Sequence, residues 1–507
     1  MLPFAHPARA DAVLPDHFTD VRLASGLDGP TTMCRTPDGR VLITERYSGK
    51  LRLLANDTLF SAAVGQVDSV ALQGEQGFLG VAVDPGFPTR PYVYVQYDVS
   101  GLSVIRISRY TLTGDLNFTG DGHLTWDPAS RYIVIGDLQD STSAHNGGTL
   151  RFGPDGMLYS CVGNDLTYCK EIYVNQLIGK ILRMNVSNLP AGPGGPAPIS
   201  LITPADNPFV SDPDPRSGLV WETGLRNPFI YQIDPISGDI FIADVGDNTY
   251  EELDLANAPG MNFGYPYFEG PLPTGLCPGI PPPPPNLTFP IYYYDRTEFL
   301  FGAVIITSGM YHVLPAARYG FPVEYKGSVF VSDLGEGFMR RLQLVNGTWQ
   351  LAPPVPGQPT PTEWALNMDG VSDYFESPDG ALWYCKFTEQ FIPKTGEIHR
   401  IVYNGELAAT SPADEPLEFA PVQPLPARGP VTLAWSLDRA ERVTISITDV
   451  SGRQVARPVD GVSFAAGFHS VTWNGTNASG LRAAAGVYFA RLDAGARRAV
   501  RRVILMR

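Results

Sequence analysis

A short turn-and-strand pattern recurs six times along most of the chain and limits the folds that it can adopt. Each copy pairs a Pro-, Asp- or Gly-containing turn with strands of alternating apolar residues. The copies begin at Pro37, Asp84, Pro154, Asp234, Tyr325 and Pro378. Turns of this kind between alternating apolar residues are strong hairpin signals. Six such repeats predict an all-β, six-bladed β-propeller, with a pair of β-sandwiches as the alternative.

Composition agrees with an all-β protein and argues against two classes of function. The 507 residues include 52 Gly and 47 Pro, and aromatic residues make up 11%, so turn formers and strand formers are both abundant. The formal net charge of −15 argues against nucleic-acid binding, which needs a basic surface. No apolar run reaches the roughly 18 residues of a membrane span. We therefore expect neither a nucleic-acid partner nor a membrane span.

The chain divides into four expected regions. Residues 1–14 resemble the remnant of a signal peptide or a tail, because Ala8-Arg9-Ala10 is typical of a secretory cleavage site. Residues 15–405 contain the propeller. Residues 406–428 are rich in Pro, Ala and acid and predict a linker. Residues 429–507 predict a small Ig-like sandwich, with strands at 431–435, 442–449, 469–473, 487–492 and 498–505.

The five cysteines leave the disulfide pairing open. They are Cys34, Cys161, Cys169, Cys277 and Cys385, and none forms a C-x-x-C motif, so a zinc site is not expected. Cys161 and Cys169 flank a short loop and could pair in an exported protein. Buried free thiols are the interpretation that we favour.

Segment 143–165 contains the clearest candidate for proton transfer. His145 lies in a His-Asn-Gly-Gly turn that precedes two short strands. The two glycines allow a sharp turn and would leave the imidazole open to a ligand. Histidine has the side chain whose ordinary pKa suits proton transfer near neutrality. The alternative is a histidine that is satisfied by hydrogen bonds within the turn.

Five segments of the propeller region resemble the soluble quinoprotein glucose/sorbosone dehydrogenases, in particular their aldose sugar dehydrogenase branch. They are 74–87 (GEQGFLGVAVDPGF), 145–159 (HNGGTLRFGPDGMLY), 178–185 (IGKILRMN), 224–253 (GLRNPFIYQIDPISGDIFIADVGDNTYEEL) and 262–270 (NFGYPYFEG). They occur in the family's order. The C-terminal region resembles FlgD-like Ig modules of secreted bacterial proteins. Some of these modules are type IX sorting signals, and a passive stalk is the alternative.

The resemblance implies an exported oxidoreductase that oxidises the C1 hydroxyl of an aldose with pyrroloquinoline quinone (PQQ). His145 would take the hydroxyl proton while hydride moves to the quinone, and Arg226 would stabilise the negative charge that develops there. Gln76, Asn227 and Arg226 would bind the cofactor. An ion pair is the alternative role for Arg226, and a hairpin-bridging amide is the alternative for Gln76.

The resemblance also implies partners, a location and calcium. An external electron acceptor and the secretion machinery would be partners of a secreted, periplasmic or cell-surface enzyme. The carbonyls of Gly246 and Asp247 would bind one Ca²⁺, and Glu252 with the carbonyl of Phe263 would bind a second, structural ion. Calcium requires six to eight oxygen ligands, and this part of the chain is rich in acid. A solvated acidic loop is the alternative.

One departure from the family pattern bears on PQQ, which is a tricarboxylate and needs cations. Where family members have Arg-x-Arg, this chain has 370–373 (GVSD), and where one branch has a lysine it has 333–336 (DLGE). The cations that would have to compensate are Arg296, Arg340, Lys386 and Lys394. A second hypothesis is therefore a propeller without cofactor that binds sugar, glycan or protein at the channel mouth. A lactone hydrolase is a third, by analogy of fold alone.

Overall fold

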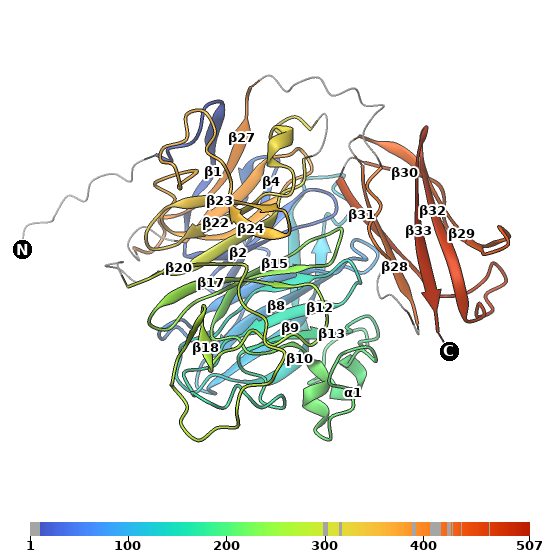
Figure 1. The fold of residues 1–507 in the computed structure, drawn as a ribbon. Coiled ribbons are helices and arrows are strands. Elements are labelled where there is room, and N and C mark those ends of the chain that lie inside the picture. The colour runs from blue at the N-terminus through green and yellow to red at the C-terminus, as the bar shows by residue number, and fades with distance from the viewer. Residues whose placement is uncertain are drawn as a thin grey trace, which may run out of the picture.

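Six antiparallel sheets succeed one another along residues 18–403 and form the blades of a propeller (Figure 1). The structure is a computed structural model that describes residues 11–297, 303–313, 317–387, 392–405, 417–422, 427, 429–437, 439–465 and 467–506. The innermost strands contact one another in a closed ring. The predicted six-bladed propeller is confirmed.

Each blade has four strands in order from the channel outward. The innermost strands are β2 (Pro30–Arg35), β7 (Phe78–Val83), β11 (Leu150–Phe152), β15 (Pro228–Ile233), β21 (Ile305–Met310) and β25 (Val371–Glu376). The second strands are β3 (Val41–Glu45), β8 (Tyr92–Val99), β12 (Leu158–Val162), β16 (Ile240–Asp244), β22 (Val329–Asp333) and β26 (Leu382–Lys386). The third strands are β4 (Lys50–Ala55), β9 (Val104–Gly114), β13 (Lys180–Met184), β17 (Tyr250–Ala256), β23 (Met339–Val345) and β27 (Gly396–Tyr403). The outer strands are β5 (Thr58–Leu59), β10 (Leu124–Gln139), β14 (Val220–Glu222), β20 (Tyr292–Asp295), β24 (Thr348–Leu351) and β1 (Phe18–Leu27).

The remaining elements are short and lie in the connections. They are β6 (Gly65–Gln66), which pairs with β4, the hairpin β18 (Phe268–Glu269) and β19 (Leu272–Pro273), α1 (Ile199–Ile202), and the 3-10 turns η1 (Pro215–Leu219) and η2 (Val323–Tyr325). Among the described residues, no helix is long and apolar enough to cross a membrane.

The ring is closed by strands from the two ends of the propeller. The sixth sheet has the order β1-β27-β26-β25, so the first strand of the chain is the outer strand of the last blade. β1 pairs antiparallel with β27 from Phe18 opposite Tyr403 to Leu27 opposite Gly396. Each of the six predicted turns joins the first strand of a blade to the second, which explains why the turn pattern counts the blades.

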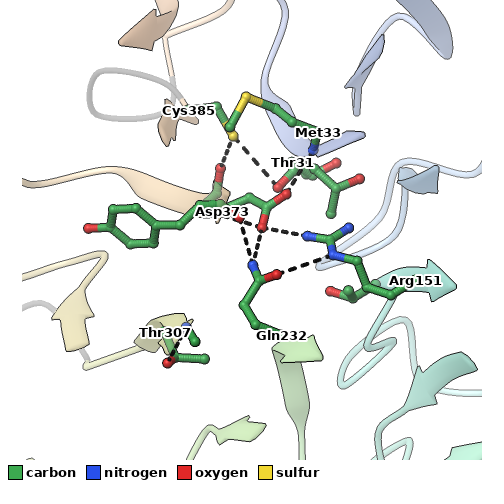
Figure 2. Close-up of polar contacts among 12 residues, drawn as sticks. Thr31, Met33, Arg151, Gln232, Thr307, Asp373 and Cys385 are labelled. Atoms are coloured by element: carbon green, nitrogen blue, oxygen red, sulfur yellow. Dashed lines mark hydrogen bonds and ion pairs between the residues drawn. The ribbon is translucent and has the colours of Figure 1, made fainter. Parts of the chain in front are cut away.

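Asp373 of β25 joins four blades across the channel (Figure 2). Its carboxylate accepts hydrogen bonds from Arg151 Nη2 at 2.6 Å, from Gln232 Nε2 at 2.9 Å and from the Met33 N–H at 2.8 Å. Those donors belong to β11, β15 and β2. Asp373 is fully buried, so the ion pair with Arg151 lies in a low-dielectric environment.

The C-terminal region is a small sandwich, as the sequence predicts. β28 (Val431–Leu437) pairs with β31 (Gly467–Trp473), and the facing sheet has the order β30 (Gln454–Phe464), β29 (Glu441–Asp449), β32 (Gly486–Ala494), β33 (Arg497–Leu505). Strand β30 was not predicted, because Pro458 and Gly461 interrupt its alternation. The described residues 417–422 of the predicted linker also pack here, with the Ala420 N–H donating to the Ala434 carbonyl at 2.9 Å.

The sandwich covers one end of the channel. Phe468, His469 and Ser470 line a cavity of about 400 Å³ together with the turns that follow β2, β7, β11 and β15. The ring of Phe468 meets that of His312 edge-on at 4.8 Å. The opposite ends of these strands form the other mouth of the channel, so a site located there is not covered by the sandwich.

A disulfide joins Cys169 to Cys277, so the expectation of free thiols is wrong for this pair. The alternative pairing of Cys161 with Cys169 is also wrong, because Cys161 is buried in β12 and free. The two bonded cysteines are 108 residues apart in sequence. Spacing along the chain does not reveal this pairing, because it depends on how the long loop 271–290 folds back.

The first prediction concerns the Asp373 contact. Asp373→Ala leaves the Arg151 guanidinium without its counter-charge, and loss of one partner of a buried ion pair costs about 3–5 kcal/mol. Chemical denaturation followed by tryptophan fluorescence measures the change in free energy of unfolding. The control is Asp206→Ala, which removes a half-exposed partner of Arg183 and should cost less than about 1 kcal/mol. Equal effects of the two variants would contradict the role assigned to Asp373.

Candidate functional site

Buried carboxylates hold the loops at the channel mouth opposite the sandwich. Asp244, the last residue of β16, accepts hydrogen bonds from the backbone N–H groups of Arg226 at 2.8 Å and Asn227 at 2.7 Å. Burial raises the pKa of Asp244 to about 7. Carboxylates at or next to the ends of other second strands act in the same way, with Glu45 accepting from the Asp28 N–H, Asp98 from the Gly77 N–H and Asp333 from the Val304 N–H. The start of the innermost strand is thereby fixed in four blades.

Asp333 and Asp373 stand where members of the family have basic residues, and the contacts of both carboxylates explain how the fold accommodates them. Asp333 is fully buried, and it also accepts a hydrogen bond from the Tyr294 hydroxyl at 2.6 Å. Asp373 is neutralised by Arg151, and both residues lie on innermost strands. Both carboxylates are thus satisfied within the fold, so neither adds an unpaired negative charge to the channel mouth.

His145 is buried and has a defined hydrogen-bonding state. Its Nδ1 lies 2.6 Å from Asn164 Oδ1, and the same oxygen accepts the Leu166 N–H at 3.1 Å. Because an oxygen that accepts from Leu166 must also accept from the imidazole, Nδ1 carries the proton and Nε2 keeps its lone pair. Burial, and next the charge of Arg226, lower the pKa of His145. The imidazole is therefore neutral and basic near pH 7.

The glycines after His145 serve close packing rather than access. A Cβ on Gly148 would lie 2.4 Å from Leu79 Cβ, and one on Gly147 would lie 2.7 Å from the Cys161 carbonyl oxygen. His145 is only 6% exposed. The expectation that the glycines leave the imidazole open is therefore wrong. They instead let the turn press against its neighbouring blade.

Arg226 lies beside His145 and forms an ion pair within its own blade. Its Nη2 donates to Asp247 Oδ1 at 2.9 Å and its Nη1 donates to the Val245 carbonyl at 2.9 Å. Its backbone carbonyl accepts the Asn164 N–H at 2.8 Å, which connects it to the partner of His145. Its buried Nε has no hydrogen-bond partner among the described residues. One donor of the guanidinium is therefore available to a ligand.

A pocket of about 190 Å³ lies next to these residues. Leu79, Phe229, Val245, Val304, Leu334 and Phe387 form most of its wall, with Thr31, Arg46, Glu75 and Asn227 as polar members. Glu75 Oε2 accepts the His145 N–H at 2.9 Å and Asn227 Nδ2 at 3.4 Å. Asn227 Oδ1 is buried and has no partner within the described part of the chain. The pocket is smaller than the roughly 300 Å³ at which ligand sites usually begin.

Gln76 lies near this pocket, but its amide is already engaged. Its Nε2 donates to Asp140 Oδ2 at 2.5 Å, and its Oε1 accepts the Gln73 N–H at 3.1 Å. This arrangement matches the alternative of a bridging amide. A role for Gln76 at the cofactor edge therefore stays a prediction.

The residues at the first predicted calcium position do not fit an ion. Arg296 Nη1 donates to the carbonyl of Gly246, and to that of Asp247 at 2.9 Å. The Asp247 carboxylate is used by Arg226 and by Asn248. Among the described residues, no group of three or more His, Cys, Asp or Glu is arranged to hold a metal ion.

The second predicted calcium position is a buried acidic cluster. Glu252 accepts the Gly270 N–H, whereas the Phe263 N–H donates to the Thr223 carbonyl in a different part of the blade. Burial, and next the charge of Asp244, raise the pKa of Glu252 well above its ordinary value. Asp254 is fully buried, and its two carboxylate oxygens have no partner among the described residues. An ion at Glu252 and Phe263 stays a prediction.

Several residues at the site were not predicted as site residues. Asn164 and Glu75 contact His145, Asp244 orients Arg226 and Asn227, and Arg46 lines the pocket. Of the compensating cations, Arg340 pairs with Glu363 at 3.0 Å, and Lys386 Nζ donates to the Asn367 carbonyl at 3.0 Å. Two signals were available: Glu75 and Asp244 lie inside segments that resemble the family, and Asn164 lies in segment 143–165 with His145.

The fold and this site define a class of protein: a six-bladed propeller whose channel mouth holds a neutral histidine beside a buried arginine, with an Ig-like module at the other end. Residues 27–389 match the family model described as Glucose / Sorbosone dehydrogenase, and residues 426–496 match the FlgD Ig-like domain. The first match covers most of the chain. The chain therefore belongs to the glucose/sorbosone dehydrogenase family.

Similar proteins come from plants and bacteria. The HIPL2 protein of Arabidopsis thaliana is 33% identical over 207 residues, which are 38% of this chain and 29% of that protein. The aldose sugar dehydrogenase YliI of Escherichia coli is 24% identical over 247 residues, which are 48% and 60% of the two chains. The matches thus span less than two thirds of these relatives. The PQQ-bound aldose sugar dehydrogenase of Streptomyces coelicolor has a similar fold, with TM-score 0.52, 21% identity, and 77% and 99% coverage.

The second prediction concerns Glu252. Because its pKa is higher in the folded than in the unfolded protein, the stability due to its neutral form is fully present below about pH 4.5 and is lost as pH rises. Without calcium, Glu252→Gln should therefore stabilise the protein by at least about 1 kcal/mol at pH 8 and have little effect at pH 4.5. Thermal unfolding in EDTA at several pH values measures this difference.

The control for Glu252 is Glu324→Gln, which changes an exposed glutamate. A Glu252→Gln variant that is less stable than wild type at pH 8 in EDTA would contradict the prediction. If an ion binds here, calcium should stabilise the wild type and leave the Gln variant unchanged.

Proposed function

We propose that the chain is an exported dehydrogenase that oxidises the C1 hydroxyl of an aldose, with PQQ as cofactor and His145 as general base. The observation that carries this proposal is the state of the imidazole. Asn164 and Leu166 hold the proton on Nδ1, and burial keeps the ring neutral. A base for a sugar hydroxyl needs this unprotonated Nε2 near neutral pH.

The buried polar atoms without partners indicate which residues would hold the quinone. Arg226 Nε offers a donor and Asn227 Oδ1 offers an acceptor. Asn227 lines the pocket, and Arg226 is its neighbour in sequence. When bound, PQQ supplies the hydride acceptor. Arg226 would place positive charge where negative charge develops, although its pairing with Asp247 neutralises part of this charge. None of these roles involves calcium, because Arg296 donates hydrogen bonds to the carbonyls that would hold it.

Arg46 is the cation that lines the pocket and could meet a cofactor carboxylate. Its guanidinium lies 5.6 Å from the Phe387 ring centre, and its Nε donates to the Gln76 carbonyl at 2.7 Å. These contacts engage part of its guanidinium within the fold. Arg46 is a single arginine, whereas the three carboxylates of PQQ would be bound best by several cationic side chains.

Export is supported by the disulfide between Cys169 and Cys277, because such bonds persist in oxidising compartments. We propose a secreted, periplasmic or cell-surface location, with an external electron acceptor. The FlgD-like module would serve as a sorting signal for the secretion machinery or as a stalk.

A second candidate function is favoured by the small, mostly apolar pocket. A propeller of this family without PQQ would bind sugar, glycan or protein at the channel mouth. It would keep His145 and Arg226 as a hydrogen-bonding surface. The two candidates differ in whether the pocket takes a tricarboxylate.

The third prediction separates these functions. We expect the full-length protein, assayed in a buffer that contains calcium, to bind PQQ, as followed by cofactor absorbance, and to oxidise an aldose in a dye-coupled assay. His145→Ala should retain binding and lower kcat by about 10²–10⁴-fold, which is the usual contribution of a general base. Absence of binding at high micromolar PQQ would overturn the dehydrogenase and leave the binding propeller.

The fourth prediction is the pH dependence. Because the pKa of His145 lies below 6.5, kcat/KM should stay level down to about pH 6.5 and fall only at lower pH. Asn164→Asp places a carboxylate beside Nδ1, which favours the imidazolium and should shift the fall to higher pH. An unchanged profile in this variant would contradict the assignment of His145.

A further inference from the structure

Arg296, directly after β20, ends in a cage of oxygen atoms. Nη1 donates to the carbonyls of Gly246 and Asp247, and Nη2 donates to the Ala303 carbonyl at 3.3 Å. Nε lies 3.2 Å from Glu251 Oε1, which belongs to a fully buried side chain. The Arg296 side chain is only 17% exposed. Four residues thus direct oxygen atoms at one guanidinium.

These four oxygens are the ligand types that a hard cation prefers. Backbone carbonyls and a carboxylate are typical of calcium sites. Two of them, the carbonyls of Gly246 and Asp247, are the groups that the family resemblance assigns to calcium. A guanidinium and a divalent ion cannot both occupy the cage, because they repel each other and compete for the same lone pairs.

We propose that the guanidinium of Arg296 takes the place of this calcium ion. The positive charge beside the cofactor pocket then comes from a side chain of the protein and not from a bound metal. The position fits that role because the cage adjoins the pocket. Val245 precedes Gly246 in the chain and Val304 follows Ala303, and both valines line the pocket. The proposal depends on the proposed function in one respect, namely that the pocket binds PQQ. The occupation of the cage by Arg296 can be tested without any cofactor.

The experiment counts calcium ions on the full-length, EDTA-treated protein by titration calorimetry in the absence of PQQ. Arg296→Gln removes the positive charge but keeps an amide that can donate to carbonyls. It should bind one more calcium ion per chain than wild type, because the cage then holds no competing charge. The matched control is Arg340→Gln, which removes an arginine that pairs with Glu363 and should bind as many ions as wild type.

Equal calcium stoichiometry in wild type and Arg296→Gln would overturn the proposal. Arg296→Lys keeps the charge and guards against a variant that fails to fold. It should gain no calcium, and a gain of one ion would also overturn the proposal.

A second measurement compares PQQ affinity of the wild type in EDTA and in calcium. The expected ratio is close to one, and a more than about tenfold gain with calcium would contradict the replacement. Failure of PQQ to bind in either condition overturns the proposed function and leaves the calcium counts as the test of Arg296.

Discussion

The buried carboxylate of Asp373 is the contact on which the centre of the propeller depends. A ring of six blades leaves a channel whose innermost strands carry polar groups with no strand beyond them to pair with. Asp373 accepts from Arg151, Gln232 and Met33, so one side chain satisfies groups from three other blades. The ion pair also restrains the distance between opposite sides of the ring. Outer closure comes from a different source, the pairing of β1 with β27.

Buried carboxylates also fix the residues of the candidate site. Carboxylates at the ends of second strands fix the loops that precede the innermost strands, and Asp244 does so directly for Arg226 and Asn227. Asn164 connects two parts of the site, because its side chain holds His145 and its backbone holds Arg226. The chemistry of the channel mouth therefore depends on groups that would not themselves touch a sugar. Their role is to fix the proton position and the charge of groups that would.

Arg296 shows how a site can retain its electrostatics while changing its components. The Gly246 and Asp247 carbonyls accept hydrogen bonds from the Arg296 guanidinium, which in our proposal supplies the positive charge in place of calcium. An arginine costs desolvation when the chain folds, but it needs no metal from the surroundings. Such an exchange is compatible with the family's fold, because the backbone carbonyls that bind the cation impose no side-chain requirement at those positions.

The sequence by itself determined the number of blades, the sandwich and the segments that carry His145 and Arg226. Those features follow from the residues of the turns and from the alternation of apolar residues in the strands. Both signals depend only on residues that are close in the chain. Tertiary structure alone decided the partners of the buried charges: Arg151 for Asp373, and the Gly246 and Asp247 carbonyls for Arg296. It alone also decided the pairing of Cys169 with Cys277. These groups lie tens to hundreds of residues apart. Arg151 and Asp373 meet because the ring brings innermost strands of different blades together, where burial makes an unpaired charge costly. Arg296 meets its carbonyls within one blade, and the disulfide joins connections of two blades.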